Sequence, residues 1–510
     1  MGFWWVQVGI AVVAAIVSFF IHEQKKRLKL HRIPGPAPLP VIGNLHMLGK
    51  RPYRTIYDLQ KTYGSIMRLW LGSQPAVVVS SPELIKEVLK DKDLQLAERP
   101  RGAVSRYVAY DLQGLSWAPY GEDWIHARKL CMRELLSPTR LRQFQEVRRE
   151  DMLQYGLQPI LDAAAQGTTV DVRTIVKRYL YTDMARMMMH KSKVDAKTVI
   201  ALEDIGRAVV HLVVAFNLED YFPIFRPLDL QGYKKTTKKV MKKYDDFVSK
   251  IIAEHRDRAN GTAVKEDDKD FVDVLLSVPG IKSQPLSESA LKNIILDIFA
   301  SSADSISEAI EWAMCELLRH PEIMKKARVE LSMVVGSDRL VEESDIPQLP
   351  YIYNIIKETL RFHSGSGLTV RVAREDVQIG GYEVPAGTFI FVAQWAVSRD
   401  PRYWERADEF DPDRFVKAPK DVHGISSFEF IPFGSGRRMC VGIHLGVIGT
   451  VLGLAQIIHC FEWELPNGEK PEDIDMDEDP GFTLPKLIPL NLLATPRLPP
   501  QVFQAYSLNV

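Results

Sequence analysis

The stretch FIPFGSGRRMCVG, residues 430–442, places a single cysteine behind two glycines and a pair of arginines near the end of the chain. The glycines allow tight backbone turns and keep side chains away from the sulfur of Cys440. The apolar run that follows, residues 443–458, predicts a helix, and a helix N-terminus favours a thiolate. A lone buried cysteine is usually a small core side chain. These neighbours instead favour Cys440 as a ligand to a flat group.

The composition of the 510 residues is that of a globular protein, with 46% hydrophobic and 25% charged residues and a formal net charge of zero. This balance gives no indication of nucleic acid as a partner. No flexible linker or repeat divides the chain, so we expect one large domain. The cysteines lie far apart and form no CxxC pair, which speaks against a disulfide scaffold or a zinc site. They are Cys131, Cys315, Cys440 and Cys460.

The N-terminus predicts a membrane anchor. Residues 1–21 carry no charged side chain, a length that spans about one bilayer core, and the basic stretch 22–32 follows directly. Basic residues after the apolar run favour a cytosolic location for the rest of the chain. A cleaved signal peptide is the alternative, although its positive charge normally precedes the apolar run. The Pro-rich residues 33–40 complete a hinge over 22–40, and residues 41–510 form the globular body.

Past the hinge, short β-type runs alternate with many amphipathic stretches, which predicts a mainly α protein with small β-sheets. One helix is expected between Pro285 and Pro321, where no Gly or Pro occurs. In its middle lies the polar stretch SSADSIS, residues 301–307, which includes Asp304. A solvated face or a helix–helix hydrogen bond is one interpretation. A functional site is the other, since polar residues that loosen a helix recur at such sites.

The spacing within residues 433–442 matches the haem-binding loop of the cytochrome P450 superfamily, and the chain resembles this family over roughly residues 31–500. Several short stretches are similar to plant microsomal hydroxylases of phenylpropanoids and flavonoids, namely RIPGPAPLPVIGNLH, AERP, FNLEDYFP and MDEDPGFTLPKLIPL. The supporting motifs, in chain order, are Phe433-x-x-Gly436-x-Arg438-x-Cys440-x-Gly442 at the end and, before it, Trp124-x-x-x-Arg128, Asp304-Ser305, Glu358-x-x-Arg361 and Pro412-Asp413-Arg414-Phe415.

The resemblance implies a P450 fold that binds haem b, iron protoporphyrin IX, with Cys440 as the ligand of the iron. Haem carries two propionates, for which arginine and an indole N–H are natural partners. The resemblance assigns these positions to Trp124, Arg128, Arg371 and Arg438, and it places Phe433 in the cofactor-binding loop. It also implies that Glu358 and Arg361 pair with Arg414 in a network that retains the fold and the haem.

Asp304 and Ser305 are the catalytic residues that the resemblance implies, because an acid and a hydroxyl relay protons where oxygen is activated. The chain departs from the family nearby. Ser301-Ser302 replaces a small Ala-Gly pair, and Ile306 stands where Ser or Thr is common. Residues 361–370, RFHSGSGLTV, replace a Pro-rich segment that lines the substrate pocket. The identity of the substrate therefore cannot be carried over from the family.

The family uses residues 103–117, 209–217, 364–370 and 481–484 to line its pocket, and these segments are mostly apolar and aromatic here. They favour a small, mostly apolar and aromatic substrate, such as a flavonoid or phenylpropanoid of plant secondary metabolism. The expected reaction is monooxygenation by hydroxylation, desaturation or rearrangement. A haem-thiolate isomerase or dehydratase independent of O₂ and NADPH is the alternative, motivated by the departures at 301–306. A non-catalytic haem sensor is the third interpretation.

The expected partners are a reductase and membrane lipid. No flavin- or nicotinamide-binding fingerprint occurs, so electrons should come from the NADPH-cytochrome P450 reductase, with Arg128, Lys129 and Arg133 as a docking face. The expected location is the endoplasmic reticulum membrane, single-pass, with the catalytic domain in the cytosol. A lysine stripe predicts a solvated helix face, with anionic lipid as an alternative ligand. It comprises Lys234, Lys235, Lys238, Lys239, Lys242 and Lys243.

Overall fold

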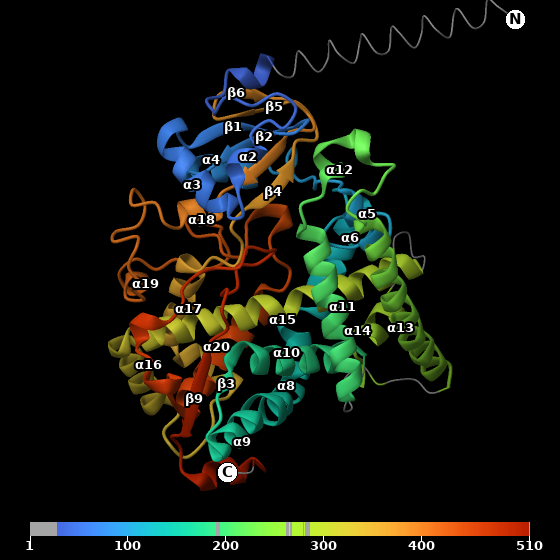
Figure 1. The fold of residues 1–510 in the computed structure, drawn as a ribbon. Coiled ribbons are helices and arrows are strands. Elements are labelled where there is room, and N and C mark those ends of the chain that lie inside the picture. The colour runs from blue at the N-terminus through green and yellow to red at the C-terminus, as the bar shows by residue number, and fades with distance from the viewer. Residues whose placement is uncertain are drawn as a thin grey trace, which may run out of the picture. The chain divides into compact units, whose positions relative to one another are not determined.

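The computed structural model describes residues 28–189, 194–261, 265, 268–278, 280 and 286–508 (Figure 1). The expected anchor over residues 1–21 lies outside these residues. The chain forms two compact units, which we describe separately. The first takes in the chain up to Pro100 with Leu368–Val397 and Ser435–Arg438. The second takes in Arg101–Gly367, Ser398–Gly434 and the chain from Met439.

The first unit is built on a four-stranded sheet of order β1-β2-β7-β4. The β1–β2 and β7–β4 pairs are antiparallel, whereas β2 and β7 run parallel. Residues 76–79 of β2 are buried, as expected for a central strand of apolar residues. The strands of the sheet are β1 (Ile66–Leu71), β2 (Gln74–Val79), β4 (Thr369–Val372) and β7 (Phe389–Val392), and a separate hairpin is formed by β5 (Val377–Ile379) and β6 (Tyr382–Val384). The helices of the first unit are α2 (Leu45–Leu48), α3 (Pro52–Tyr63), α4 (Pro82–Lys86) and α18 (Gln394–Val397), with the short helical turns η1 (Glu87–Asp91) and η8 (Gly436–Arg438).

Part of the expected Pro-rich hinge packs on this sheet. The backbone N–H of Arg68 on β1 donates to the carbonyl of Pro34 (2.8 Å), and Arg68 Nη1 donates to the carbonyl of Gly35 (3.3 Å). A Cβ on Gly35 would come within 2.4 Å of the Arg68 carbonyl, so only glycine permits this close approach. Ile33 is buried next to it. Residues 33–35 therefore belong to the first unit.

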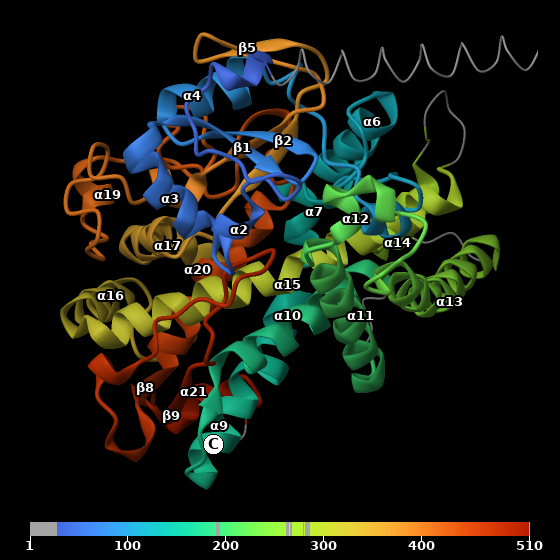
Figure 2. The same cartoon turned by 45° about the horizontal axis from the view of Figure 1, so that its top comes forward.

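The second unit is mainly helical, and the long helix expected between Pro285 and Pro321 is confirmed as α15 (Glu288–Arg319). Ser287 caps its start, with Oγ accepting from the backbone N–H of Ala290, and Pro321 begins the next helix after His320. In both views α15 crosses this unit beside α10 (Val172–Met189) and α20 (Ile443–Cys460) (Figures 1 and 2).

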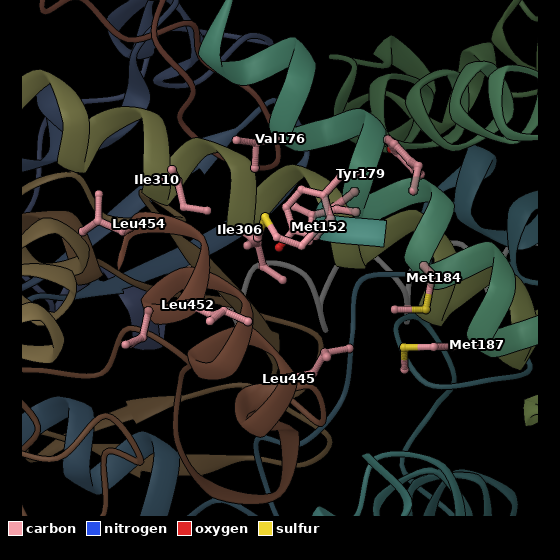
Figure 3. Close-up of a cluster of buried hydrophobic side chains, with 14 of the residues drawn as sticks. Met152, Val176, Tyr179, Met184, Met187, Ile306, Ile310, Leu445, Leu452 and Leu454 are labelled. Carbon is pink, nitrogen blue, oxygen red and sulfur yellow. The ribbon is translucent and has the colours of Figure 1, made fainter. Parts of the chain in front are cut away.

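Glycines bring α20 close to α15. A Cβ on Gly449 would lie 3.0 Å from Ile306, and one on Gly453 would lie 2.6 Å from Ile310. Figure 3 shows these isoleucines among the buried side chains of α10 and α20. Among the described helices α20 alone is long and apolar enough to span a membrane, but 83% of it is buried, which is the pattern of a core helix.

The remaining elements complete a mainly helical fold with small sheets, as predicted. The second unit contains a three-stranded sheet of order β3-β9-β8. Its strands are β3 (Val170–Asp171), β8 (Phe461–Glu464) and β9 (Asn491–Pro496). The other helices are α5 (Ala103–Val108), α6 (Glu122–Leu130), α7 (Pro138–Gln143), α8 (Gln145–Asp151), α9 (Gln158–Gln166), α11 (Ala196–Val214), α12 (Leu218–Tyr221), α13 (Tyr233–Gly261), α14 (Phe271–Ser277), α16 (Pro321–Val334), α17 (Pro350–Phe362), α19 (Arg414–Lys417) and α21 (Pro500–Ala505), with the turns η2 (Cys131–Leu135), η3 (Met152–Leu157), η4 (Pro223–Phe225), η7 (Glu343–Gln348), η9 (Pro466–Gly468) and η10 (Pro471–Asp473).

The lysine stripe lies on α13, and the prediction of a solvated helix face is confirmed for most of it. Lys234 is half-buried and forms an ion pair with Glu219 (2.6 Å). Lys242 pairs with Asp246 one turn away (2.9 Å). The exposed members of the stripe are Lys235, Lys238, Lys239, Lys242 and Lys243.

Candidate active site

Cys440 lies in a loop that its own backbone ties together. Its backbone N–H donates to the carbonyl of Phe433 (2.9 Å), and α20 begins three residues later at Ile443. A Cβ on Gly446, in the first turn of α20, would lie 3.2 Å from the Phe433 ring, so the small residue lets this ring pack on the helix. Cys440 is exposed, whereas the other three cysteines are buried. The loop therefore presents one thiol at the start of an apolar helix.

The electrostatic surroundings of Cys440 include groups that favour its thiolate. The surrounding protein raises the pKa of the Cys440 thiol, while a hydrogen bond from the backbone N–H of Gly442 and the charge of Arg128 lower it. Burial also raises the pKa of the Cys460 thiol, and there the charge of Arg497, without a backbone hydrogen bond, lowers it. A backbone donor aimed at the sulfur thus distinguishes Cys440.

Helix α6 brings Arg128 to the cysteine loop. Arg128 Nη1 donates to the carbonyl of Met439, next to Cys440, over 2.7 Å. Its guanidinium also lies 5.5 Å from the centroid of the Trp124 ring, in a cation–π contact. The Trp124 indole N–H donates to the carbonyl of Leu115 (2.9 Å). The structure thus joins Arg128 to the cysteine loop, and it directs the N–H of Trp124 to the backbone of the loop before α6.

The first unit holds the other two arginines of the predicted cofactor set. Arg371 on β4 is 1% exposed, and Arg438 is also buried, with its Nε donating to the carbonyl of Ala97 (2.9 Å). A third arginine, Arg99, was missed by the sequence analysis although it lies in the AERP stretch. Its Nη1 donates to the carbonyl of Val370 (2.7 Å), and its Nε has no hydrogen-bond partner among the described residues. Buried guanidinium groups of this kind are suited to bind anionic groups.

Asp304 and Ser305 lie on α15, and each already has a partner. Asp304 Oδ1 pairs with the ammonium of Lys177 on α10 (2.8 Å). Ser305 Oγ makes a long hydrogen bond of 3.4 Å to the carbonyl of Ser301, one turn back. Ser302 Oγ likewise donates to its own helix, to the carbonyl of Phe299 (3.0 Å). The additional hydroxyls are therefore bonded locally, and nothing in the sequence pattern indicated Lys177.

The polar face of α15 continues for another turn. Glu311 pairs with Arg173 of α10 (2.6 Å), one turn before Lys177. Between the two ion pairs lies Glu308, whose Oε1 accepts a hydrogen bond from Thr483 Oγ1 (2.9 Å). Burial raises the pKa of Glu308 to about 8, and the nearby charge of Asp304 adds to this. No sequence pattern indicates Glu308, because an isolated acid in a helix belongs to no motif.

The family network on α17 is confirmed. Arg361 Nε and Nη2 each donate to a Glu358 oxygen (2.7 Å), and Arg414 Nε donates to Glu358 Oε1 (2.9 Å). Arg361 also donates to the carbonyls of Ser398 (2.8 Å) and Ala407 (3.0 Å). The Glu358 and Arg361 side chains are fully buried.

Two of the segments expected to line the pocket are held on α15. Asp297 Oδ2 accepts from the backbone N–H groups of Leu115 (2.7 Å) and Ser116 (3.2 Å). Gly114, at φ +87°, allows this approach, since a Cβ there would come within 1.8 Å of Asn293 Oδ1. At the other segment, Trp312 Nε1 donates to the carbonyl of Leu484 (2.9 Å).

The two other expected segments are 209–217 and 364–370. In 209–217, Val209 and Leu212 are buried, whereas Val214 and Phe216 at the end of α11 are exposed. The segment 364–370 is divided between the two units. Within its first part, Ser364 Oγ donates to the carbonyl of Ser366 (2.8 Å), which closes a short local turn.

Comparison with known proteins agrees with these features. Residues 33–490 match the family described as Cytochrome P450. The chain is 38% identical to cytochrome P450 CYP736A12 of Panax ginseng, over 95% of this chain and 97% of the relative. It is 36% identical to 3,9-dihydroxypterocarpan 6A-monooxygenase of Glycine max (96% and 98%) and 36% identical to costunolide synthase of Lactuca sativa (92% and 95%).

A solved zebrafish cytochrome P450 with progesterone has a similar fold. Its TM-score is 0.74 at 23% identity, over 87% of this chain and 99% of that structure. The relatives named as monooxygenases favour oxygen incorporation over the isomerase and sensor alternatives. The family also implies haem as the cofactor, a small-molecule substrate, and a reductase that passes on electrons from NADPH. The chain is therefore a cytochrome P450 of the plant A-type clan, an oxidoreductase that incorporates oxygen from O₂.

Proposed function

We propose that Cys440 would ligate the haem iron, and that Trp124, Arg128, Arg371 and Arg438 would hold the haem propionates. The carrying observation is the exposed thiol of Cys440 with the backbone N–H of Gly442 directed at its sulfur. The buried guanidinium groups of Arg371 and Arg438 suit a dianionic group. When bound, a haem with a thiolate ligand supplies the activation of dioxygen.

Cys440→Ser tests this assignment. We expect loss of the thiolate-type carbon monoxide difference spectrum, because a hydroxyl cannot replace the sulfur as an electron-donating ligand. The control is Cys131→Ala, which removes a buried thiol. An unchanged spectrum in Cys440→Ser would contradict the proposal.

Asp304, Lys177 and Ser305 move protons in the proposed reaction. The ammonium of Lys177 pairs with Asp304 Oδ1 over 2.8 Å and so orients this side chain. Ser305 follows directly and holds its hydroxyl only by a weak bond of 3.4 Å, so this group is free to rotate toward another acceptor. Asp304 thus accepts and returns a proton, and Ser305 carries it into the site.

The proposed substrate is a small, mostly apolar, aromatic plant metabolite such as a flavonoid or phenylpropanoid. Two observations support it. The segments 103–117 and 481–484 are rich in apolar residues, and Phe482 is half exposed beside Thr483. One relative is named 3,9-dihydroxypterocarpan 6A-monooxygenase, while others are named for tabersonine and costunolide, so the names of the relatives cover several classes of metabolite.

A labelling experiment tests this function. Membranes that contain the protein and a plant reductase receive flavonoids and phenylpropanoids under heavy-isotope dioxygen, with and without NADPH, and products are identified by mass spectrometry. We expect an NADPH-dependent product that carries one labelled oxygen. Loss of two hydrogens without label would indicate desaturation. Product formed equally without NADPH would contradict monooxygenation in favour of isomerisation, and conversion of other metabolites alone would overturn the substrate class.

The proposed reductase-docking face is the exposed basic side of α6 and the turn η2. Lys129 and Arg133 are exposed there, next to the half-buried Arg128. We expect Lys129→Glu or Arg133→Glu to weaken electron transfer from the reductase while the carbon monoxide spectrum stays intact. Unchanged coupling would refute the assignment.

The proposed location is the endoplasmic reticulum membrane, with residues 1–21 as the single anchor and the body in the cytosol. The proposal is supported by the uncharged run of residues 1–21 and by the basic stretch that follows it. Removal of residues 1–21 is expected to release the protein from sedimented membranes. Retention of the shortened protein in an alkaline-washed pellet would contradict a single anchor.

A further inference from the structure

Glu308 is a buried acid of α15 that forms no ion pair within the described part of the chain. Its side chain is 5% exposed, and Thr483 Oγ1 donates to its Oε1 over 2.9 Å. Its neighbours on the same helix are both compensated, Asp304 by Lys177 and Glu311 by Arg173. Glu308 thus lies between two ion pairs, where burial of an uncompensated charge is costly.

The charges around Glu308 favour its neutral form. Burial raises its pKa to about 8, the charge of Asp304 acts in the same direction, and Lys177, the Thr483 hydroxyl and Arg173 only partly oppose this. The carboxyl is therefore mostly protonated at neutral pH and ionises in mildly alkaline solution. The titratable and charged groups that face it or its neighbours are Asp304 and Glu311 on α15, Arg173, Lys177 and Tyr181 on α10, Glu203 and Arg207 on α11, and Lys486.

The partner of Glu308 belongs to a segment that α15 holds at several points. Thr483 bonds Glu308, and the carbonyl of Leu484 accepts from the indole N–H of Trp312 (2.9 Å). Farther along, the backbone N–H of Leu490 donates to Glu311 Oε1 (2.9 Å). Phe482 directly precedes Thr483 and is 49% exposed. The Glu308–Thr483 bond is therefore the fastening point closest to the exposed aromatic side chain.

We propose that Glu308 is a positioning residue of the active site: its buried carboxyl holds Thr483, and with it the segment 481–484, while Lys177 stays paired with Asp304. The inference rests on the proposed function, which assigns this segment to the substrate pocket. An ionised Glu308 would compete with Asp304 for the ammonium of Lys177, because the two acids lie one helical turn apart. The carboxylate would keep its bond from Thr483, because an ionised acceptor is the stronger one, so its movement toward Lys177 would carry the segment 481–484 with it and displace the catalytic acid.

Ligand titrations of the full-length haem protein at pH 7 and pH 9 test this inference. Two probes are used: imidazole, which reports on the iron alone, and 4-phenylimidazole, whose ring also occupies the pocket. Each affinity is expressed for the neutral form of the probe, because an imidazole ring itself binds a proton near neutral pH. If binding of the larger probe requires neutral Glu308, the competent fraction falls from about 0.9 to about 0.1 over this range. The affinity of 4-phenylimidazole relative to imidazole should therefore fall about tenfold in the parent.

Isosteric variants separate Glu308 from other titrating groups. Glu308→Gln stays neutral, so its affinity ratio should be independent of pH, and Thr483→Val should have a reduced ratio already at pH 7. The matched control is Glu330→Gln, an acid of α16 whose pKa is also raised by burial but which bonds the backbone of Tyr351 and Ile352. It should keep the parental pH profile.

The results that would contradict the role of Glu308 differ from the result that would contradict the haem site. A parental ratio that does not change with pH, or a Glu308→Gln variant that keeps the parental profile, would overturn the inference. A Thr483→Val variant with the parental ratio would overturn the role of the hydrogen bond. Failure of imidazole itself to shift the haem spectrum would instead contradict the proposed haem site, so the two failures are distinguishable.

Discussion

Two polar networks of the second unit differ in how completely their charges are compensated. In the α17 network, Glu358 receives two hydrogen bonds from Arg361 and one from Arg414, and backbone carbonyls accept the remaining N–H groups of Arg361. On the α15 face, one ammonium, that of Lys177, serves Asp304, and Glu308 lies one turn away without a cation among the described residues.

The difference distinguishes side chains that stabilise the fold from side chains that can exchange protons. A network in which every donor has an acceptor holds one arrangement and exchanges no protons, because any change leaves a buried charge. A network in which one buried acid lacks a cation, as Glu308 does among the described residues, keeps that acid titratable at a pKa close to neutral pH. We therefore expect mutations in the first network to act on folding, and mutations in the second to act on turnover.

The largest effect is expected for Glu358→Gln. It leaves two buried guanidinium groups without their counter-charge, which costs about 3–5 kcal/mol of unfolding free energy. The measurement is the thermal unfolding midpoint together with the yield of haem-loaded protein from its carbon monoxide spectrum. Glu322→Gln, an exposed acid at the start of α16, is the control and should behave like the parent. An unchanged midpoint in Glu358→Gln would remove the basis of the comparison.

Asp304→Asn should affect turnover instead of folding. The ion pair with Lys177 is lost, but this pair is partly exposed, so the unfolding midpoint should change little. Loss of the acid should slow reductase-supported NADPH oxidation by about a hundredfold and increase its solvent isotope effect. A midpoint lowered as much as in Glu358→Gln, with turnover intact, would show that the α15 face is structural as well.

A smaller effect is expected at Ser305. Its hydroxyl is held only by the bond of 3.4 Å to the Ser301 carbonyl, so Ser305→Ala costs little stability. We expect more hydrogen peroxide released per NADPH, about tenfold at most, because one proton donor is lost. Ser305→Thr restores a hydroxyl and should restore coupling. Peroxide release that is equal in the Ala and Thr variants would exclude the hydroxyl as the cause.

The contrast between the two networks also explains what the sequence could predict. Glu358 and Arg361 lie one turn apart in a motif, and the residues around Cys440 are contiguous, so their spacing carries the information. The bounds of α15 follow from Pro285 and Pro321, as the structure confirms.

The missed contacts join segments that are distant in sequence. Lys177 and Thr483 reach α15 only through the packing of α10 and of the C-terminal segment, which no local pattern encodes. The motif of Trp124 likewise identifies the residue, and only the packing of the loop before α6 shows that its indole N–H donates to the Leu115 carbonyl. Local spacing thus identifies a residue, whereas tertiary packing decides its partner.

The smallest effect is expected on α13. It tests whether burial, rather than the mere presence of an ion pair, decides the loss of stability. Lys242 and Asp246 form an i,i+4 pair at 2.9 Å, but the lysine side chain is 75% exposed. Water already solvates both charges, so Lys242→Ala should change the unfolding free energy by about 0.5 kcal/mol or less. The loss should disappear at high salt, since exposed pairs are screened, whereas the loss in Glu358→Gln should persist. Chemical denaturation with urea at low and high salt measures both. A large, salt-independent loss in Lys242→Ala would mean that exposure to water does not weaken this ion pair, and that burial is not what makes the Glu358 network the more costly one to break.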